Sequence, residues 1–191
     1  MVITWEQRKL GKLGNTFSGL NGKTRDDFGH GNSRFVTYMN VFSNPISNPR
    51  MVESVEIEED EKQTEIQYGD VFFTTSSETP QEVGMSSIWL ENVKNTYLNS
   101  FCFGYRLTAD LDAYYLAFLL RSELIRKKFW ILAQGISRYN ISKEKVMNIE
   151  IPIPKLEEQK KIGKTFLLVD NLITLHQRKL NTLKRIVVTI D

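Results

Sequence analysis

The chain has 191 residues, of which 41% are hydrophobic and 25% are charged, and its formal net charge is +2. These values predict one domain, or a domain with an appendage, folded around an apolar core. They exclude a membrane-spanning helix, since no apolar run approaches about 20 residues, and a disulfide framework, since Cys102 is the only cysteine. The N-terminus has no signal-peptide pattern, so we expect a cytoplasmic protein that does not contact a membrane.

The first third of the sequence predicts little regular structure. Residues 5–13 predict a short helix or turn that leads into a strand, and residues 14–34 hold five glycines among polar residues, which is typical of a long loop. Residues 35–42 alternate loosely and predict a strand. Residues 53–61 carry six acidic side chains, which we interpret as a solvated face rather than a metal site.

The middle of the chain predicts strands and one helix. Strands are expected at 71–74, 87–90 and 101–107, and a polar Ser/Thr loop follows the first of them. Apolar residues at helical spacing predict a helix over residues 113–129, with basic residues in its last turn. Cys102 has aromatic neighbours in the sequence and is predicted to be a buried thiol.

The segment NIEIPIPKLEEQKKI, residues 148–162, changes from strand to helix across two prolines. Pro152 predicts that the strand lies at a sheet edge, because proline has no N–H for a ladder. Pro154 suits the first turn of the helix that follows. We therefore expect a mixed α/β globular domain over residues 1–154, followed by a long helix, able to form a coiled coil, over residues 155–191.

A heptad stripe runs along this helix, which is expected from Leu156 to Val187 and about 48 Å long. The a and d positions are Ile162, Phe166, Val169, Ile173, His176, Leu180, Leu183 and Val187. The chain offers no second helix of similar length, so we expect the partner helix to come from another copy or another subunit. His176 is interpreted as a tolerated residue of this dimerisation stripe rather than a ligand.

The charge is unevenly distributed. Residues 155–187 carry eight basic and three acidic residues, whereas residues 1–154 carry 17 basic and 19 acidic residues. Non-specific nucleic-acid binders show a broad basic excess, so any DNA binding has to depend on local clusters. No ATPase, serine hydrolase, adenine methyltransferase or nuclease motif is complete, and we predict no catalytic residue, metal or cofactor for this chain.

Three polar loops hold residue types that read bases or bind phosphates, at residues 15–34, 74–79 and 134–140. Arginine can bond guanine, asparagine or glutamine can bond adenine, and serine and threonine can bond either. The candidate DNA-binding residues are Asn15, Lys23, Arg25, Arg34, Thr75, Ser76, Gln134, Ser137, Arg138 and Tyr139. Composition leaves open the alternative that these are ordinary surface loops.

Four stretches resemble the specificity subunits of type I restriction–modification systems. They are WEQRKLGKL (5–13), GDVFFTTSSETPQEVG (69–84), YLNSFCFGYRL (97–107) and GISRYNISKEKVMNIEIPIPKLEEQKKI (135–162). The last is the most specific, with a Gly-x-x-Arg turn, a strand ending in Pro-x-Pro, and Glu-Gln opening a Lys-rich helix. The resemblance implies that the body is a target recognition domain whose loops enter DNA grooves, and that the helix is the family's dimerising spacer.

The resemblance also implies the partners. A specificity subunit has no activity of its own; it directs methyltransferase subunits, which use S-adenosylmethionine, and an ATP-driven restriction subunit to a bipartite site in double-stranded DNA. Full-length subunits carry two recognition domains and two helical regions packed antiparallel, whereas this chain has one of each, as a half-subunit or a fragment would. A homodimer would then rebuild the twofold arrangement.

The sequence also leaves two other function classes open. A protein-interaction scaffold or inhibitor that uses the coiled coil without reading DNA is the alternative, and the excess of acidic residues in the body favours it. A stand-alone nuclease is disfavoured because Glu158-Gln159-Lys160, which has the Glu-x-Lys spacing of a nuclease core, lies at the start of the helix without an acidic partner from a preceding strand.

Overall fold

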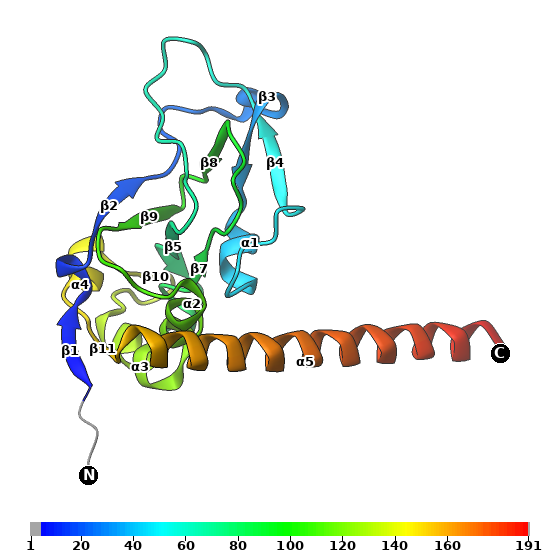
Figure 1. The fold of residues 1–191 in the computed structure, drawn as a ribbon. Helices are drawn as coiled ribbons and strands as arrows, with labels where there is room; N and C mark the ends of the chain where they lie inside the picture. Colours follow the sequence, from blue (N-terminus) through cyan, green and yellow to red (C-terminus); the bar gives the residue numbers. More distant parts are fainter. Residues whose placement is uncertain (1–4, 191) are drawn as a thin grey trace.

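The fold is a mixed α/β body from which one long helix projects (Figure 1). The computed structural model describes residues 5–190, and their side chains up to residue 184. The expected fold class, a mixed α/β domain with a long C-terminal helix, is confirmed. Within residues 5–190, no helix has both the length and the apolar character needed to cross a membrane.

The strands form four small sheets. They are β1 (Glu6–Lys9), β2 (Gly14–Ser18), β3 (Phe28–Val36), β4 (Val52–Val55), β5 (Val71–Thr74), β6 (Ser76–Ser77), β7 (Ser86–Ile88), β8 (Thr96–Leu98), β9 (Cys102–Leu107), β10 (Tyr139–Asn140) and β11 (Glu150–Ile153). The central sheet has the order β2-β9-β5-β7 and is antiparallel. A second sheet has the order β4-β3-β8, with β3 parallel to β8, and the remaining strands pair as β1-β11 and β6-β10.

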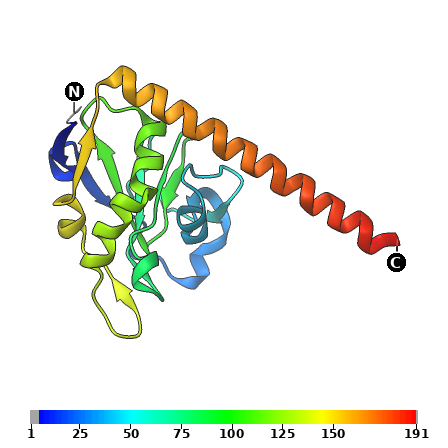
Figure 2. The same ribbon diagram turned by 90° about the horizontal axis from the view of Figure 1, so that it is seen from below.

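The helices lie mainly in the second half of the chain. They are α1 (Tyr38–Ser43), α2 (Ala113–Arg121), α3 (Glu123–Leu132), α4 (Lys143–Met147) and α5 (Leu156–Ile190), with single 3-10 turns η1 (Leu10–Lys12), η2 (Arg25–Asp27) and η3 (Pro80–Glu82). Figure 2 shows α2 and α3 beside the sheets and α5 crossing α2 before it leaves the body.

Strand β5, inside the central sheet, is buried on both faces. Side chains alternate along β5, so Val71 and Phe73 join the core formed with α2, α3 and α4, whereas Phe72 joins the core formed with α1, β3 and β8. Phe73 stacks on Phe103 and on Phe129 of α3, with ring centroids 5.1 and 5.9 Å away. Burying each such side chain contributes about 1.5–3 kcal/mol, and this packing fixes α2 and α3 relative to the sheet.

Several sequence predictions are confirmed. Strands β5 and β9 lie where the sequence predicted strands, and Cys102 is buried. Strand β11 pairs with β1 alone among the described strands, which is the edge position that Pro152 predicts. The prediction for Pro154 is wrong, because α5 begins only at Leu156 and Pro154 precedes it.

The N-terminal region is more ordered than its sequence predicts. Residues 5–13 form the unpredicted strand β1 and the 3-10 turn η1, which leads into β2 as expected of a turn there, and residues 14–34 contain β2, η2 and most of β3 rather than a long loop. Two of the glycines lie inside β3, where Gly29 and Gly31 adopt φ values of +90° and +100°. They accompany the shift in register against β4 between Phe28 and Ser33. Glycine tolerates this backbone, so here it marks a bulge within a strand rather than a loop.

Two predicted elements are divided where a side chain caps a helix. Only the start of residues 35–42 is strand, because the Thr37 side chain accepts a hydrogen bond from the Asn40 N–H (3.2 Å) and begins α1. The helix predicted over residues 113–129 is two helices. Ser122 is extended between them (φ −65°, ψ 150°), and its hydroxyl donates to a carbonyl in the last turn of α2 (2.7 Å).

Candidate nucleic-acid interface

Two of the three predicted loops meet in the structure. Strand β10 pairs antiparallel with β6, which sets Tyr139 opposite Ser77 and Asn140 opposite Ser76. Gln134 bridges to Asn140 through two backbone hydrogen bonds of 2.8 and 2.9 Å, so residues 134–140 form a small hairpin. This pairing joins segments about 60 residues apart in the sequence, and it places Ser137 and Arg138 beside β6.

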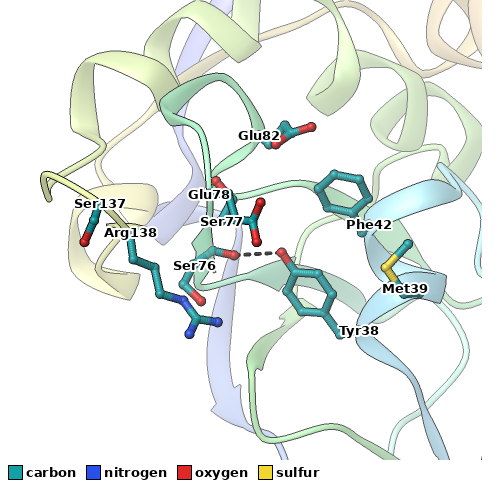
Figure 3. Close-up of a pocket in the computed structure, with 9 residues that line it drawn as sticks. All are labelled: Tyr38, Met39, Phe42, Ser76, Ser77, Glu78, Glu82, Ser137 and Arg138. Atoms are coloured by element: carbon teal, nitrogen blue, oxygen red, sulfur yellow. Dashed lines mark hydrogen bonds between the residues drawn. The ribbon is translucent and has the colours of Figure 1, made fainter.

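An open cavity of about 630 Å³ lies at this junction (Figure 3). Its lining comes from α1, from the segment from β6 to η3, and from the hairpin. The lining residues are Tyr38, Met39, Phe42, Ser76, Ser77, Glu78, Glu82, Ser137 and Arg138. Three of the predicted DNA-binding residues, Ser76, Ser137 and Arg138, are therefore brought together here. The contribution of α1 was missed, because its residues were predicted to be strand.

Helix α1 contributes two aromatic residues to the cavity wall, and their spacing in the sequence was a signal that could have predicted this helix. Tyr38 and Phe42 are four residues apart, as neighbours on a helix face are, and their rings stack with centroids 5.9 Å apart. Together with a threonine at the N-cap, this spacing is typical of a helix. The Tyr38 hydroxyl donates to the Ser76 carbonyl (2.7 Å), and burial raises the pKa of the Tyr38 phenol, so it remains a donor that ties α1 to β6.

Two arginines, one half-buried and one buried, hold the cavity walls from behind. The Arg121 guanidinium of α2 donates to the carbonyls of Val41, Phe42, Asn44 and Ser86 at 2.7–3.0 Å and so fixes the C-terminal end of α1. Arg126 of α3 donates to the carbonyls of residues 81, 83 and 84, just after η3 begins. Burial lowers the pKa of each guanidinium to about 10, which leaves both charged at neutral pH. Carbonyl acceptors, not carboxylates, satisfy these two charges.

Thr75, one of the predicted DNA-binding residues, uses its polar groups to bind the backbone of the exposed residue Phe101. Its N–H and its hydroxyl both donate to the Phe101 carbonyl, at 3.1 and 2.9 Å. The Phe101 N–H in turn donates to the Asn99 side chain (2.9 Å). The Phe101 ring is 61% exposed and lines a second, mainly apolar cavity of about 370 Å³, which shares Tyr38 and Met39 with the first.

The remaining predicted DNA-binding residues do not line the first cavity. Asn15 is exposed on β2, Arg25 lies in η2, and Arg34 is exposed on β3. Lys23 forms ion pairs with Glu61 and with Asp27, and its side chain is only 5% exposed. Gln134 is exposed at the base of the hairpin, and Tyr139 packs partly against the main core.

Helix α5 is anchored to the body by its first turns. The Gln159 side chain is buried. Its amide oxygen accepts a hydrogen bond from the Asp112 N–H (3.0 Å), and its amide NH2 group donates one to the Pro154 carbonyl (2.9 Å). Gly163 lies so close to α2 that a Cβ there would be 2.6 Å from the Tyr115 backbone nitrogen. Phe166 stacks on Phe118 of α2 with ring centroids 5.8 Å apart.

Beyond this anchor, the body leaves the heptad stripe uncovered. At the a and d positions, Phe166, Val169, Ile173, Leu180 and Leu183 are 46–53% exposed, and His176 is exposed as well. Ile162, next to the anchor, is half-buried, and the Val187 side chain lies outside the described side chains. The flanking Leu168, Leu172 and Leu175 are 56–62% exposed and widen the apolar face. The His176 ring bonds the Leu172 carbonyl of its own helix (2.8 Å).

Comparison with known proteins gives a consistent family. The family model described as "Type I restriction modification DNA specificity domain" matches residues 3–185. The type I restriction enzyme MjaVIII specificity subunit of Methanocaldococcus jannaschii is 35% identical over 69 residues, which cover 36% of this chain and 16% of that protein. The matched part is thus a small share of the relative's length.

Solved structures share the fold at low sequence identity. The S subunit of a type I restriction–modification system from M. genitalium has a TM-score of 0.57 and 17% identity, over 89% of this chain and 40% of that one. The HsdS subunit from Thermoanaerobacter tengcongensis has a TM-score of 0.61 and 17% identity, over 93% of this chain and 40% of that one. In both cases this chain corresponds to less than half of the other.

Proposed function

The chain belongs to the family of type I restriction–modification DNA specificity domains, and from this membership we propose that it is one DNA-reading half of a specificity subunit. Residues 1–154 act as the target recognition domain, and residues 155–191 act as the spacer and dimerisation helix. Two copies form a homodimer that reads a bipartite site in double-stranded DNA. The dimer positions methyltransferase subunits, and through them a restriction subunit, and performs no chemistry itself. The assembly acts in the cytoplasm.

The observation that carries this proposal is the uncovered apolar face of α5. From Phe166 to Leu183 the a and d side chains are about half-exposed, although the same helix is locked to α2 at Gln159 and Gly163. An apolar heptad face of this length is stabilised by a second helix that packs into it. A second copy supplies such a helix with matching length and pattern, and its twofold symmetry generates two readers of inverted half-sites.

The length of α5 gives the scale of the bipartite site. From Phe166, which stacks on Phe118 of α2, to its end at Ile190, the helix runs about 36 Å at 1.5 Å per residue. That is about one turn of DNA. Paired helices therefore hold the two bodies at least about one DNA turn apart, so that both can face the same side of the duplex.

DNA reading by the body is supported by the convergence of polar loops on one cavity. Ser76, Ser137 and Arg138 were selected from the sequence as base- or phosphate-binding types, and β6–β10 pairing brings them to one place. The body has no basic excess, since residues 1–154 carry 17 basic and 19 acidic residues. We therefore propose that the body alone binds DNA weakly and that the methyltransferase subunits supply much of the phosphate contact.

Association through α5 can be tested with matched variants. Leu180→Asp places a charge at an a position and is expected to convert the dimer to a monomer in sedimentation equilibrium at micromolar concentration, because an unpaired charge would be buried. Asn181→Asp adds the same charge one residue away, at a position facing away from the stripe, and is expected to leave the dimer intact. A monomeric wild-type chain, or a Leu180→Asp variant that dimerises like wild type, would contradict the homodimer.

The excess of acidic residues in the body favours a second candidate, a scaffold or inhibitor that uses α5 without reading DNA. Electrophoretic mobility shift with the methyltransferase subunits, with and without this chain, separates the two functions. A DNA reader is expected to confer sequence-specific binding that the methyltransferase alone lacks. A scaffold would join the complex without changing which DNA is bound.

A further inference from the structure

The first cavity carries opposite charges on two of its walls. Glu78 follows β6, Glu82 ends η3, and Arg138 comes from the hairpin at residues 134–140 (Figure 3). Among the side chains that the structure describes, Arg138 forms no ion pair with either glutamate. The charges therefore do not neutralise each other, and both remain available to a ligand.

The two glutamates differ in what they already bind. The Glu82 carboxylate accepts a hydrogen bond from the Thr79 hydroxyl (2.8 Å), whereas Glu78 is exposed and its carboxylate takes no donor among the described residues. An ionised carboxylate only accepts hydrogen bonds, and a DNA phosphate, being an anion, repels it. On a DNA surface it pairs with an amino group, which the major groove presents as cytosine N4 or adenine N6.

Arg138 needs the opposite kind of partner, a hydrogen-bond acceptor. A guanidinium only donates, and the base edge that matches its two-pronged geometry is guanine, with acceptors at O6 and N7. A G·C pair presents these acceptors next to the cytosine amino group, so one base pair satisfies a donor side chain and an acceptor side chain together. An A·T pair offers the amino group but not the paired acceptors.

The walls that carry these side chains are fixed before any ligand arrives. Pairing of Ser77 with Tyr139 holds the hairpin against β6, and the Tyr38 hydroxyl ties α1 to the Ser76 carbonyl. Arg126 holds the chain on both sides of Glu82, at the carbonyls of residues 81 and 83. Side chains on such fixed supports can distinguish one base pair from another, because little ordering is required when DNA binds.

We propose that this cavity reads a G·C base pair from the major groove, with Arg138 donating to guanine O6 and N7 and Glu78 accepting from the cytosine N4 amino group. The proposal rests on the DNA-reading function proposed above. It assigns the acidic side chain a role in sequence selection, although an acid on a DNA-binding face would otherwise weaken binding.

Whether Glu78→Gln weakens or strengthens DNA binding tests the proposal. The chain is assembled with its methyltransferase subunits, and its recognition sequence is first determined by methylation profiling. Glu78→Gln is expected to weaken binding to the cognate duplex about ten- to a hundredfold. Glu59→Gln, which removes an equal charge from the acidic segment, is the control and is expected to bind cognate DNA at least as tightly as wild type.

The base pair is identified with modified duplexes. At one G·C position of the half-site, 7-deazaguanine, which lacks N7, and 2-pyrimidinone, which lacks the cytosine amino group, are expected to weaken wild-type binding. Arg138→Ala should abolish the effect of the first analogue, and Glu78→Gln the effect of the second, at that same position.

Three outcomes would overturn the proposal while leaving the DNA-reading function intact. Glu78→Gln could tighten binding to all sequences, Arg138→Ala could weaken all sequences equally with a salt dependence reduced by about one phosphate contact, or the half-site could lack a G·C pair. If the wild-type complex shows no sequence preference at all, the DNA-reading function itself fails.

Discussion

Replacing Gly163 with alanine tests whether a backbone contact sets the angle at which α5 leaves the body. A Cβ at this position would lie 2.6 Å from the Asp112 carboxylate oxygen and 2.6 Å from the Tyr115 nitrogen. These two atoms form the N-cap hydrogen bond of α2 (2.8 Å) and cannot easily move apart. Normal contact at about 3.4 Å therefore requires α5 to retreat by about 0.8 Å.

The size of the resulting tilt follows from the anchor at Gln159. That residue keeps its bonds to the Asp112 N–H and the Pro154 carbonyl, about 6 Å along the helix from Gly163. A displacement of about 0.8 Å at that distance is a tilt of about 8°, which moves the helix by about 5 Å at Lys184, 25 residues from the anchor. In DNA this is between one and two base-pair steps.

The stability change combines two opposing effects. Overpacking costs about 1–3 kcal/mol, and replacing a helical glycine with alanine contributes about 0.5–1 kcal/mol in the other direction. We expect a net loss of up to about 2.5 kcal/mol in the free energy of unfolding, measured by urea titration with circular dichroism. The exposed Asn171→Ala is the control, because it adds helix propensity with no close contact.

Methylation profiling of the assembled complex measures the geometric effect. The Gly163→Ala complex is expected to prefer a spacer one or two base pairs different from that of wild type, or to lose activity at the original spacer. If Gly163→Ala is as stabilising as Asn171→Ala, the close approach to α2 is wrong. If stability falls while the preferred spacer is unchanged, α5 does not act as the ruler between half-sites.

Three further changes test other parts of the structure. Arg121→Met leaves four carbonyl groups without their charged donor and is expected to lower the free energy of unfolding by about 3 kcal/mol in urea; a loss below about 1 kcal/mol would mean that these bonds contribute little. Burial raises the pKa of the Cys102 thiol to about 12, so at pH 8 about one molecule in ten thousand is a thiolate, and we expect a disulfide reagent to label it only in unfolded protein; rapid labelling of the native chain would contradict this. Lys23→Ala is expected to weaken DNA binding less than Arg138→Ala, because its ammonium group is already in ion pairs; an equal loss in binding titrations would mean that these pairs open on DNA.

Local patterns in the sequence were sufficient where one element is defined by its own residues. Local strand signals located β5 and β9, and the 4-3 spacing located α5 with its apolar face. That face was expected to lack a partner within the chain, and the described side chains from Phe166 to Leu183 are indeed left about half-exposed. Residue motifs near Pro152 and Pro154 also indicated the family, which the match over residues 3–185 shows.

Local patterns failed where a partner strand or a cap decided the outcome. The glycine-rich residues 14–34 are not amphipathic, yet they form strands because β9 and β4 pair with their backbone. Thr37 and Ser122 interrupt apolar runs that continue on both sides of them, so periodicity alone predicted one element where capping creates a boundary.

The sequence by itself determined the family, the projecting helix and the kinds of side chain able to meet DNA. Only the tertiary structure decided which of those side chains line one cavity. The cavity exists because residues 76–77 pair with residues 139–140, and because Arg121 and Arg126 bind carbonyls 35–80 residues away in the chain. Such contacts depend on the global path of the backbone. Periodicity is a relation between residues that are close in the sequence, so it carries no information about these long-range contacts.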